Sequence, residues 1–223
     1  MYLLTPEYIN KMKIYSKKLF EGKASLIAQT YLCGLLFLSL AIPFLSPYSD
    51  DIYGGVNFEI SGQPPSILHW FGTDSAGRDV FTITISAGIS SLKVALGVMV
   101  LSMLMGVPIG LFSGVSKKKT DEVIMRITDG FLAFPPLILP IVITAALGPS
   151  INNVIIGISI SWFPWYVRIA RSQSIIISTL DYVSISKSMG ASKFYIIKKH
   201  ILPNSINPIL TQASIDAGYA ILT

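Results

Sequence analysis

Charged residues are scarce in this chain. Only 13% of its 223 residues are Asp, Glu, Lys or Arg, whereas 52% are hydrophobic. An average soluble domain carries about a quarter charged residues. The shortage of charge excludes a disordered chain, because disorder goes with low hydrophobicity. It also argues against a single soluble core, whose surface would need more charge than this chain supplies.

Residues that build chemical sites are also few. The single cysteine, Cys33, excludes an intrachain disulfide and a paired-thiol site. The two histidines lie far apart in the sequence, and His69 with Asp74 and Asp79 matches no known metal-binding spacing. No Walker A motif is present. We therefore expect no catalytic residue, metal or cofactor in this chain.

The chain has long uncharged stretches instead, at residues 24–49, 94–116 and 130–167. About 20 apolar residues are enough to cross a bilayer as a helix. These stretches predict an all-α, polytopic membrane helical bundle. The predicted spans are residues 24–46, 92–112, 127–147 and 154–167, with an incomplete helix at 207–223. The regions between them are an N-terminal segment (1–23), a loop (47–91) and a longer loop (168–204).

The basic residues predict an orientation, because loops rich in Lys and Arg stay in the cytoplasm. Lysines crowd residues 1–23, 117–119 and 168–204, whereas residues 48–79 carry five acids and one arginine. The turn at residues 148–150 has no basic residue. This alternation predicts a multi-pass membrane protein with a cytoplasmic N-terminus and the loop 47–91 outside.

Small and bending residues occur within the predicted spans. Gly106 and Gly110 are four residues apart, a spacing that allows another helix to approach closely. Prolines also fall within or beside the spans and indicate bent helix axes, because each leaves a backbone carbonyl without its helical partner. They are Pro108, Pro135, Pro136, Pro140 and Pro164.

The loop 168–204 is too long for a simple turn, and its pattern predicts two short amphipathic helices. Ser178 with Asp181 resembles a capping box. Gly190 is suited to end the first helix and Ser192 to cap the second. The remaining signals are apolar stripes at Tyr182, Ile185 and Met189 and at Phe194, Ile197 and Ile201, with a stop at Leu202 and Pro203. The two helices either lie on the inner leaflet or dock a cytoplasmic partner.

Three motifs resemble a known family. MGAS at residues 189–192 followed by HILPN at 200–204 is similar to the cytoplasmic coupling loop of binding-protein-dependent ABC importer permeases. HWFGTD at 69–74 with GRDV at 77–80 resembles the signature before the second span of the dipeptide, oligopeptide and nickel subfamily. DEV at 121–123 with FP at 134–135 resembles the start of its third span. The order and spacing also match, and the second of the two permease subunits is the most similar type.

The resemblance implies a MetI-like type I transmembrane domain in the plasma (inner) membrane, with residues 92–223 as the permease core. It implies half of a heterodimeric translocation path for di- or oligopeptides or a related substrate such as nickel. The expected partners are a sister permease subunit, two cytoplasmic ABC ATPase subunits, an extracytoplasmic substrate-binding protein and membrane lipid, but no nucleic acid. ATP and Mg²⁺ are expected in the ATPase subunits.

The resemblance also indicates site residues. For the ATPase-coupling loop they are Tyr182, Ile185, Met189, Gly190, Ala191, Ser192, Ile201, Leu202 and Pro203. For the outer-loop signature they are Thr73, Asp74, Gly77, Arg78 and Asp79. The family's coupling loop usually opens Glu-Ala-Ala, where this chain has Ser184, Ile185 and Ser186. Because the leading carboxylate is absent, we expect the apolar part of the loop to matter most.

The acidic residues near the spans allow more than one role. Asp74, Arg78 and Asp79 cluster before the second span. They either contact the binding protein or hold the gate, or they form a local set of ion pairs that fixes the fold of the loop. We favour the local set. Asp129 is a pathway candidate, because acids within spans are rare. Its pairing with Arg126 and Glu122 along one helix is the simpler account. Asp216 either faces the pathway or is exposed to water.

Other classes stay open as alternatives. A channel that works without ATP, or a structural membrane protein, would not need the loop 190–203. A membrane enzyme would need paired carboxylates, histidine clusters or a nucleophile in the spans. The segment 209–223 makes a helix of only ~22 Å, shorter than a bilayer core of ~30 Å. We therefore expect that the chain stops inside a span. A non-functional truncated permease is accordingly one of the alternatives.

Overall fold

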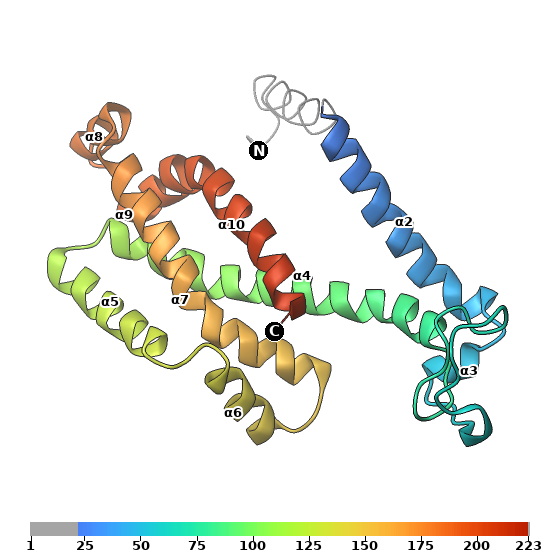
Figure 1. The fold of residues 1–223 in the computed structure, drawn as a ribbon. Coiled ribbons are helices and arrows are strands. Elements are labelled where there is room, and N and C mark those ends of the chain that lie inside the picture. Colours follow the sequence, from blue (N-terminus) through green and yellow to red (C-terminus); the bar gives the residue numbers. More distant parts are fainter. Residues whose placement is uncertain (1–21, 223) are drawn as a thin grey trace. The chain divides into compact units, whose positions relative to one another are not determined.

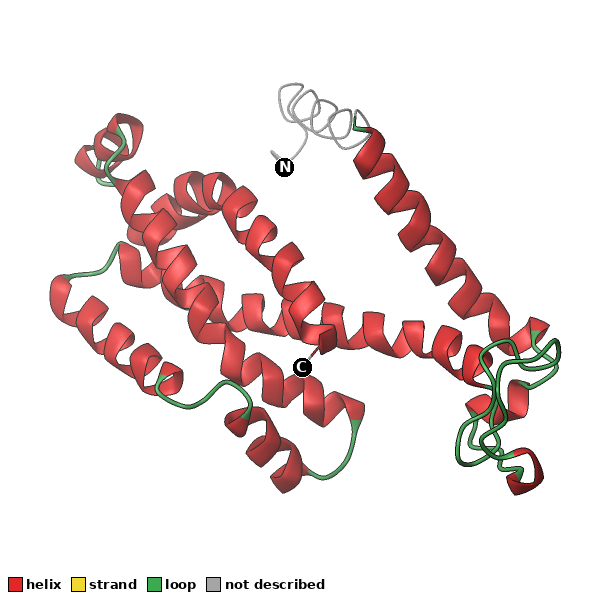
Figure 2. Ribbon diagram, viewed as in Figure 1, coloured by secondary structure: helices red, strands yellow, loops and turns green. Residues whose placement is uncertain are grey.

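The computed structural model describes residues 22–222, which form helices joined by short turns and one long loop (Figures 1 and 2). Within this range the extended pairing is one isolated bridge between Thr73 and Asp79. The all-α prediction is confirmed. The predicted cytoplasmic N-terminal segment lies outside the described residues, apart from its last two positions. The chain divides into two compact units, residues 1–90 and 91–223, and the division falls within one long helix.

The first unit contains α2, a long loop and the start of α4. Its elements are α2 (Lys23–Leu45), α3 (Ser49–Ile52), the 3-10 turn η1 (Phe58–Ile60) and the first part of α4 (Val80–Gly114). The hydroxyls of Ser46 and Thr82 lie 2.7 Å apart. The end of α2 therefore lies level with the first turn of α4.

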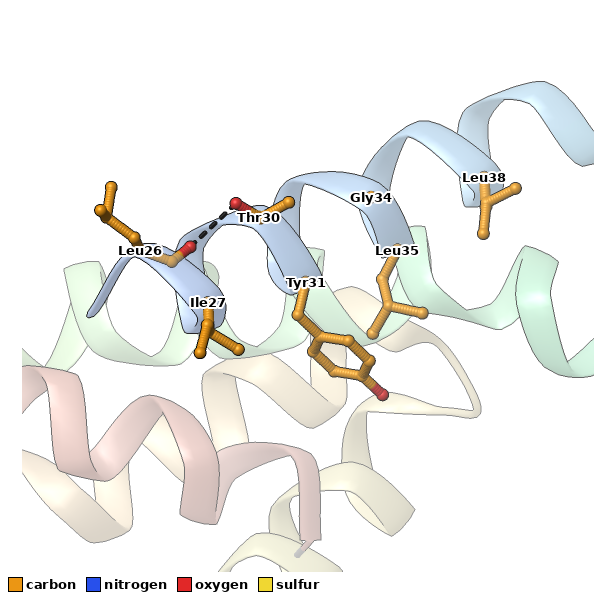
Figure 3. Close-up of a pocket in the computed structure, with 7 residues that line it drawn as sticks. All are labelled: Leu26, Ile27, Thr30, Tyr31, Gly34, Leu35 and Leu38. Carbon is orange, nitrogen blue, oxygen red and sulfur yellow. Dashed lines mark hydrogen bonds between the residues drawn. The ribbon is translucent and has the colours of Figure 1, made fainter. Parts of the chain in front are cut away.

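Most of α2 is apolar and exposed. Figure 3 shows the side chains that stand out from its first half, among them Ile27 and Tyr31, which are 70% and 65% exposed. The Thr30 hydroxyl donates to the Leu26 carbonyl at 2.8 Å. Such a bond satisfies the hydroxyl within its own helix, as an apolar environment requires. α2 is therefore suited to face lipid.

In the second unit α7 (Ile151–Ser178) is the central helix. α5 (Lys118–Leu132), α6 (Ile138–Leu147) and α10 (Leu202–Leu222) all pack against it. The largest core cluster joins α4, α7 and the segments that follow α7. Its buried members are Val107, Leu111, Tyr166, Ala170, Ile177, Val183, Ile196, Ile201, Ile209 and Ala213.

α4 and α7 cross at a seam of glycines. A Cβ added at Gly106 or Gly110 would collide with the backbone of α7, and one at Gly114 would collide with Ser174. The Ser174 hydroxyl donates to the Leu111 carbonyl across the same seam at 2.9 Å. The close helix contact predicted at the first two glycines is confirmed.

The third predicted span, 127–147, is wrong as a single helix, because residues 133–137 separate α5 from α6. Pro135 and Pro136 lie in this break. Proline cannot donate a helical hydrogen bond, and it disfavours helical backbone in the residue before it. The two prolines therefore end α5 rather than only bending it.

Three other predicted boundaries differ from the helices. α4 begins at Val80 rather than 92, α10 begins at Leu202 rather than 207, and α7 continues to Ser178 rather than ending at 167. The hydropathy pattern marks only the apolar part of each helix, and Arg168 and Arg171 continue α7 because arginine is a good helix former. Two of the described helices, Leu26–Leu45 and Val80–Gly114, are long and apolar enough to cross a membrane.

Candidate functional site

Residues 179–204, the coupling segment, connect α7 to α10 through a tight joint. α8 (Asp181–Ser188) is followed by a turn at Gly190 and by α9 (Lys193–Ile196). A π-helical turn, η2 (Ile197–Ile201), then runs directly into α10. The predicted stop at Leu202 and Pro203 is wrong. Pro203 lies in the first turn of α10. This helix comes directly after the π-helical turn η2, in which the spacing of the helical hydrogen bonds differs from that of an α-helix.

The turn between α8 and α9 depends on local chemistry. Gly190 has φ +85°, a left-handed conformation that glycine adopts without strain. The Ser192 hydroxyl accepts from the Tyr195 amide at 3.3 Å, so the predicted cap is confirmed. The predicted capping box is wrong, because α8 begins after Leu180 without a side-chain cap. The Ser178 hydroxyl is buried and has no hydrogen-bond partner among the described residues.

Three apolar side chains anchor the segment in the core. Val183 of α8, Ile196 of α9 and Ile201 of η2 are almost completely buried, in the cluster that contains Ile177 of α7. Ile201 was expected on the docking surface, but it holds the segment from inside. The first two anchors were missed because each falls between the residues assigned to an apolar stripe.

The opposite side of the segment is an exposed apolar face. Tyr182, Ile185, Met189 and Phe194 are 42%, 59%, 83% and 72% exposed. Phe194 was predicted to share one apolar stripe with Ile201, but the two side chains lie on different sides, since Phe194 is exposed and Ile201 is buried. Ala191 is half-buried, whereas Leu202 and Pro203 are exposed. A pairing of buried anchors with exposed apolar residues is suited to docking another protein.

His200 fastens α8 to the start of α10. Its Nε2 lies 3.0 Å from the Ser186 hydroxyl, and its ring contacts those of Tyr182 and Tyr195 with centroids 5.6 and 5.8 Å apart. The Asn204 amide donates to the His200 carbonyl at 2.6 Å. Ser186 occupies the place of the second alanine of the family motif. The altered motif therefore supplies an internal contact that alanine could not make.

Two ion pairs join α5 to α7. Arg171 donates to both oxygens of Asp121 at 2.6 Å, and the Ser113 hydroxyl of α4 donates to the same carboxylate at 2.6 Å. The Arg171 hydrogen bond holds the pKa of Asp121 below its ordinary value. Arg168 donates to Asp129 at 2.7 Å. The predicted pairing of Asp129 along its own helix is therefore wrong, because its ion-pair partner among the described residues, Arg168, comes from α7.

Asp216 lies half-buried in α10. It accepts a hydrogen bond at 2.8 Å from Gln212, one turn earlier. The Tyr166 hydroxyl of α7 is buried close to this carboxylate and makes no hydrogen bond of normal geometry with a described residue. Asp216 therefore belongs to a polar contact between α7 and α10, and its role in a pathway stays a prediction.

The outer-loop signature builds the start of α4. Asp74 accepts from the backbone and side chain of Arg78, at 2.9 and 2.8 Å. The hydrogen bond from the Arg78 backbone, followed by the one from its side chain, contributes most to holding the pKa of Asp74 below its ordinary value. Asp79 accepts from the Thr82 amide at 2.8 Å, as a helix cap does, and from His69 Nδ1 at 3.0 Å. The ion pair of Asp74 with Arg78 agrees with the local set favoured from the sequence, whereas Asp79 pairs with His69 instead of Arg78.

The other signature residues close the loop. The Thr73 hydroxyl donates to the Ile60 carbonyl and accepts from the Gln63 amide. Gly77 has φ +76° and lies so close to the Asn57 carbonyl that a Cβ would collide with it. Among the described residues, no group of three or more His, Cys, Asp and Glu side chains is arranged to hold a metal ion.

Comparison with known proteins gives the same family as the motifs. Residues 106–223 match the family described as binding-protein-dependent transport system inner membrane component. The probable D,D-dipeptide transport system permease DdpC of Escherichia coli K12 is 43% identical over 84% of this chain and 62% of its own length. The dipeptide permease DppC of Alkalihalophilus pseudofirmus is 35% identical over 92% and 67%. The glutathione permease GsiD of Pectobacterium atrosepticum is 32% identical over 85% and 63%.

The chain spans 62 to 67% of the length of these three relatives. The matched residues include the glycine seam, both α5–α7 ion pairs and the whole coupling segment. The long loop and the start of α4 lie outside the family match, and they contain the subfamily signature at residues 69–74 and 77–80. The chain belongs to the family of inner membrane components of binding-protein-dependent transport systems.

Proposed function

We propose that this chain is a permease subunit of an ATP-driven ABC importer for short peptides or a chemically related substrate. The relatives named for dipeptides, D,D-dipeptides and glutathione support this substrate class. The proposed partners are a sister permease, two ATPase subunits that hydrolyse ATP, and an extracytoplasmic substrate-binding protein.

The observation that carries the proposal is the coupling segment. Its buried anchor residues hold the exposed apolar face in place. The last turn of the segment, η2, continues without a break into α10. A displacement of α8 by a docked partner would therefore be transmitted directly to α10. A channel that opens without ATP has no use for such an element.

The proposed orientation follows the basic residues. The lysines at the start of α5 and within the coupling segment favour the cytoplasm, and the acids of the loop after α2 favour the other side. In this orientation the coupling segment faces the compartment that contains ATP. We propose that residues 127–147, 154–167 and 207–223 also lie in the membrane, in addition to the two helices that are long and apolar enough to cross it.

The test uses co-purification of the ATPase subunits and substrate-stimulated ATP hydrolysis in liposomes. Gly190→Pro is expected to abolish association, because proline cannot adopt the positive φ found there. Ile185→Asp is expected to do the same, because it places a charge on the docking face. Unchanged ATPase recovery with both variants would refute the docking role.

Ser184→Glu is the matched control for Ile185→Asp. It adds the same charge to the same helix, at the neighbouring exposed residue, and it restores the carboxylate of the family motif. We expect association to be retained or strengthened. Loss of association with Ser184→Glu would mean that any new charge on α8 disrupts docking.

A further inference from the structure

An exposed apolar tip extends from the loop between α2 and α4. Ile67 and Leu68 occupy the middle of a four-residue turn and are 94% and 73% exposed. The Ser66 amide donates to the His69 carbonyl at 2.8 Å, and the His69 amide donates to the Ser66 hydroxyl at 3.0 Å. Such turns usually carry small or polar residues at their centre. Two bulky aliphatic side chains there need an apolar partner.

Two aromatic side chains extend the tip and are fixed to α4. Trp70 and Phe71 are 64% and 55% exposed. Both rings pack on that of Phe81 in the first turn of α4, with ring centroids 5.0 and 5.3 Å apart. Tryptophan is enriched where a membrane protein meets the boundary between lipid and water. The tip is therefore held at the point where α4 begins.

The distribution of charge separates the tip from the rest of the loop. Residues 63–73 contain no Asp, Glu, Lys or Arg, and His69 is buried against Asp79. The other part of the loop mixes its exposed apolar residues with Asp50, Asp51 and Glu59. The tip is thus the uncharged side of an otherwise acidic loop.

The tip is also continuous with the lipid-facing surface of α2. An apolar cavity of about 360 Å³ has Ile42 and Leu45 of α2 on one side and Ile67, Leu68 and Trp70 on the other. The Ser46–Thr82 contact keeps the end of α2 level with the start of α4. If α2 crosses the bilayer, the tip therefore lies at the membrane surface and not above it.

We propose that residues 66–71 are a membrane-interface anchor that inserts into the headgroup and acyl boundary of the leaflet where α2 ends. The occupant is phospholipid, with acyl chains against the aliphatic turn and the cavity, and headgroups near Trp70. The anchor fixes the first turn of α4 relative to the bilayer. The proposal rests on the membrane-spanning role of α2 but not on the substrate.

The test places nitroxide spin labels on the full chain in lipid nanodiscs, in a Cys33→Ala background. Ile67→Cys and, separately, Leu68→Cys are expected to collide severalfold more with oxygen, which partitions into lipid, than with a water-soluble nickel chelate. Glu59→Cys in the same loop is the matched water-facing control and should show the reverse. Phe44→Cys on α2, 88% exposed, is the lipid-facing control.

The proposal is overturned if both tip labels are as accessible to nickel as the label at residue 59. A lipid signature at residue 44 with water signatures at the tip refutes the anchor alone. Water signatures at all of these positions also refute the span. Tip labels that are open to nickel but become shielded when the substrate-binding protein is added would assign the surface to that protein instead of lipid.

Discussion

At the residue scale, the two ion pairs between α5 and α7 differ in environment. Asp121 is partly buried and accepts two bonds from Arg171 and one from Ser113. The pair of Asp129 and Arg168 is about half exposed on both sides. Exposed pairs contribute little, because water screens the charges and the side chains lose entropy. The first pair should therefore stabilise the unit more than the second.

Asp121→Asn is expected to lower the free energy of unfolding by about 1.5–3 kcal/mol, the usual range for hydrogen bonds to a charged group. Asp129→Asn should cost less than about 1 kcal/mol. Denaturation in mixed detergent micelles measures both values. Equal losses for the two variants would contradict the ranking.

The same carboxylate predicts a dependence on pH. Because its folded pKa is lowered, the stabilisation by Asp121 is fully present above the ordinary value of 3.8 and is lost as pH falls through the lowered folded value. The difference in stability between wild type and Asp121→Asn should therefore shrink in that acidic window. A difference that stays constant there would show that the ion pair is not its origin.

At the scale of elements, α4 and α7 are held together by the absence of side chains. A Cβ added at Gly106 or Gly110 would lie no more than 2.5 Å from a carbonyl oxygen of α7, and backbone cannot move aside as a side chain can. Membrane helices gain little from hydrophobic burial in lipid, so close packing is a main source of their association. The glycine seam is therefore central to the second unit.

Gly110→Ala and Gly130→Ala form a matched pair within helices. At Gly110 the methyl group would overpack the seam, at a cost of about 1–3 kcal/mol. At Gly130 of α5 nothing lies within 4 Å, so the change should stabilise the helix by about 0.5–1 kcal/mol. The two unfolding free energies, measured by detergent denaturation, should move in opposite directions. Stabilisation by Gly110→Ala would contradict the close contact.

At the scale of the whole molecule, the placement of the loops across the membrane determines what each surface can meet. In the proposed orientation the coupling segment lies in the cytoplasm, where its α8 face would meet the proposed ATPase subunits. In the same orientation, the acidic loop after α2 faces the compartment of a substrate-binding protein. The orientation is therefore the condition for the proposed import function.

Single cysteines in a Cys33→Ala background test the orientation with a membrane-impermeant maleimide. Glu59→Cys and Ser150→Cys are expected to react in intact cells whose outer barrier is opened. Lys118→Cys should react only after the inner membrane is permeabilised, because basic loops stay inside. Reaction of residue 118 before permeabilisation would reverse the proposed topology.

The sequence by itself determined the features that depend on near neighbours. Uncharged runs predicted the apolar helices, Gly190 and Ser192 predicted a turn and a cap, and the small-residue spacing predicted a close helix contact. Each rests on residues a few positions apart, so local rules are enough. The family motifs likewise needed only order and spacing.

Only the tertiary structure decided which distant residues meet. It paired Asp129 with Arg168 of α7 rather than with Arg126 of the same helix. It also buried Ile201 while exposing Phe194. It also carried η2 into α10 past Pro203, where the local pattern indicated a stop. These outcomes depend on how helices pack around α7. A pattern along one helix cannot show which of its faces the neighbouring helices will cover.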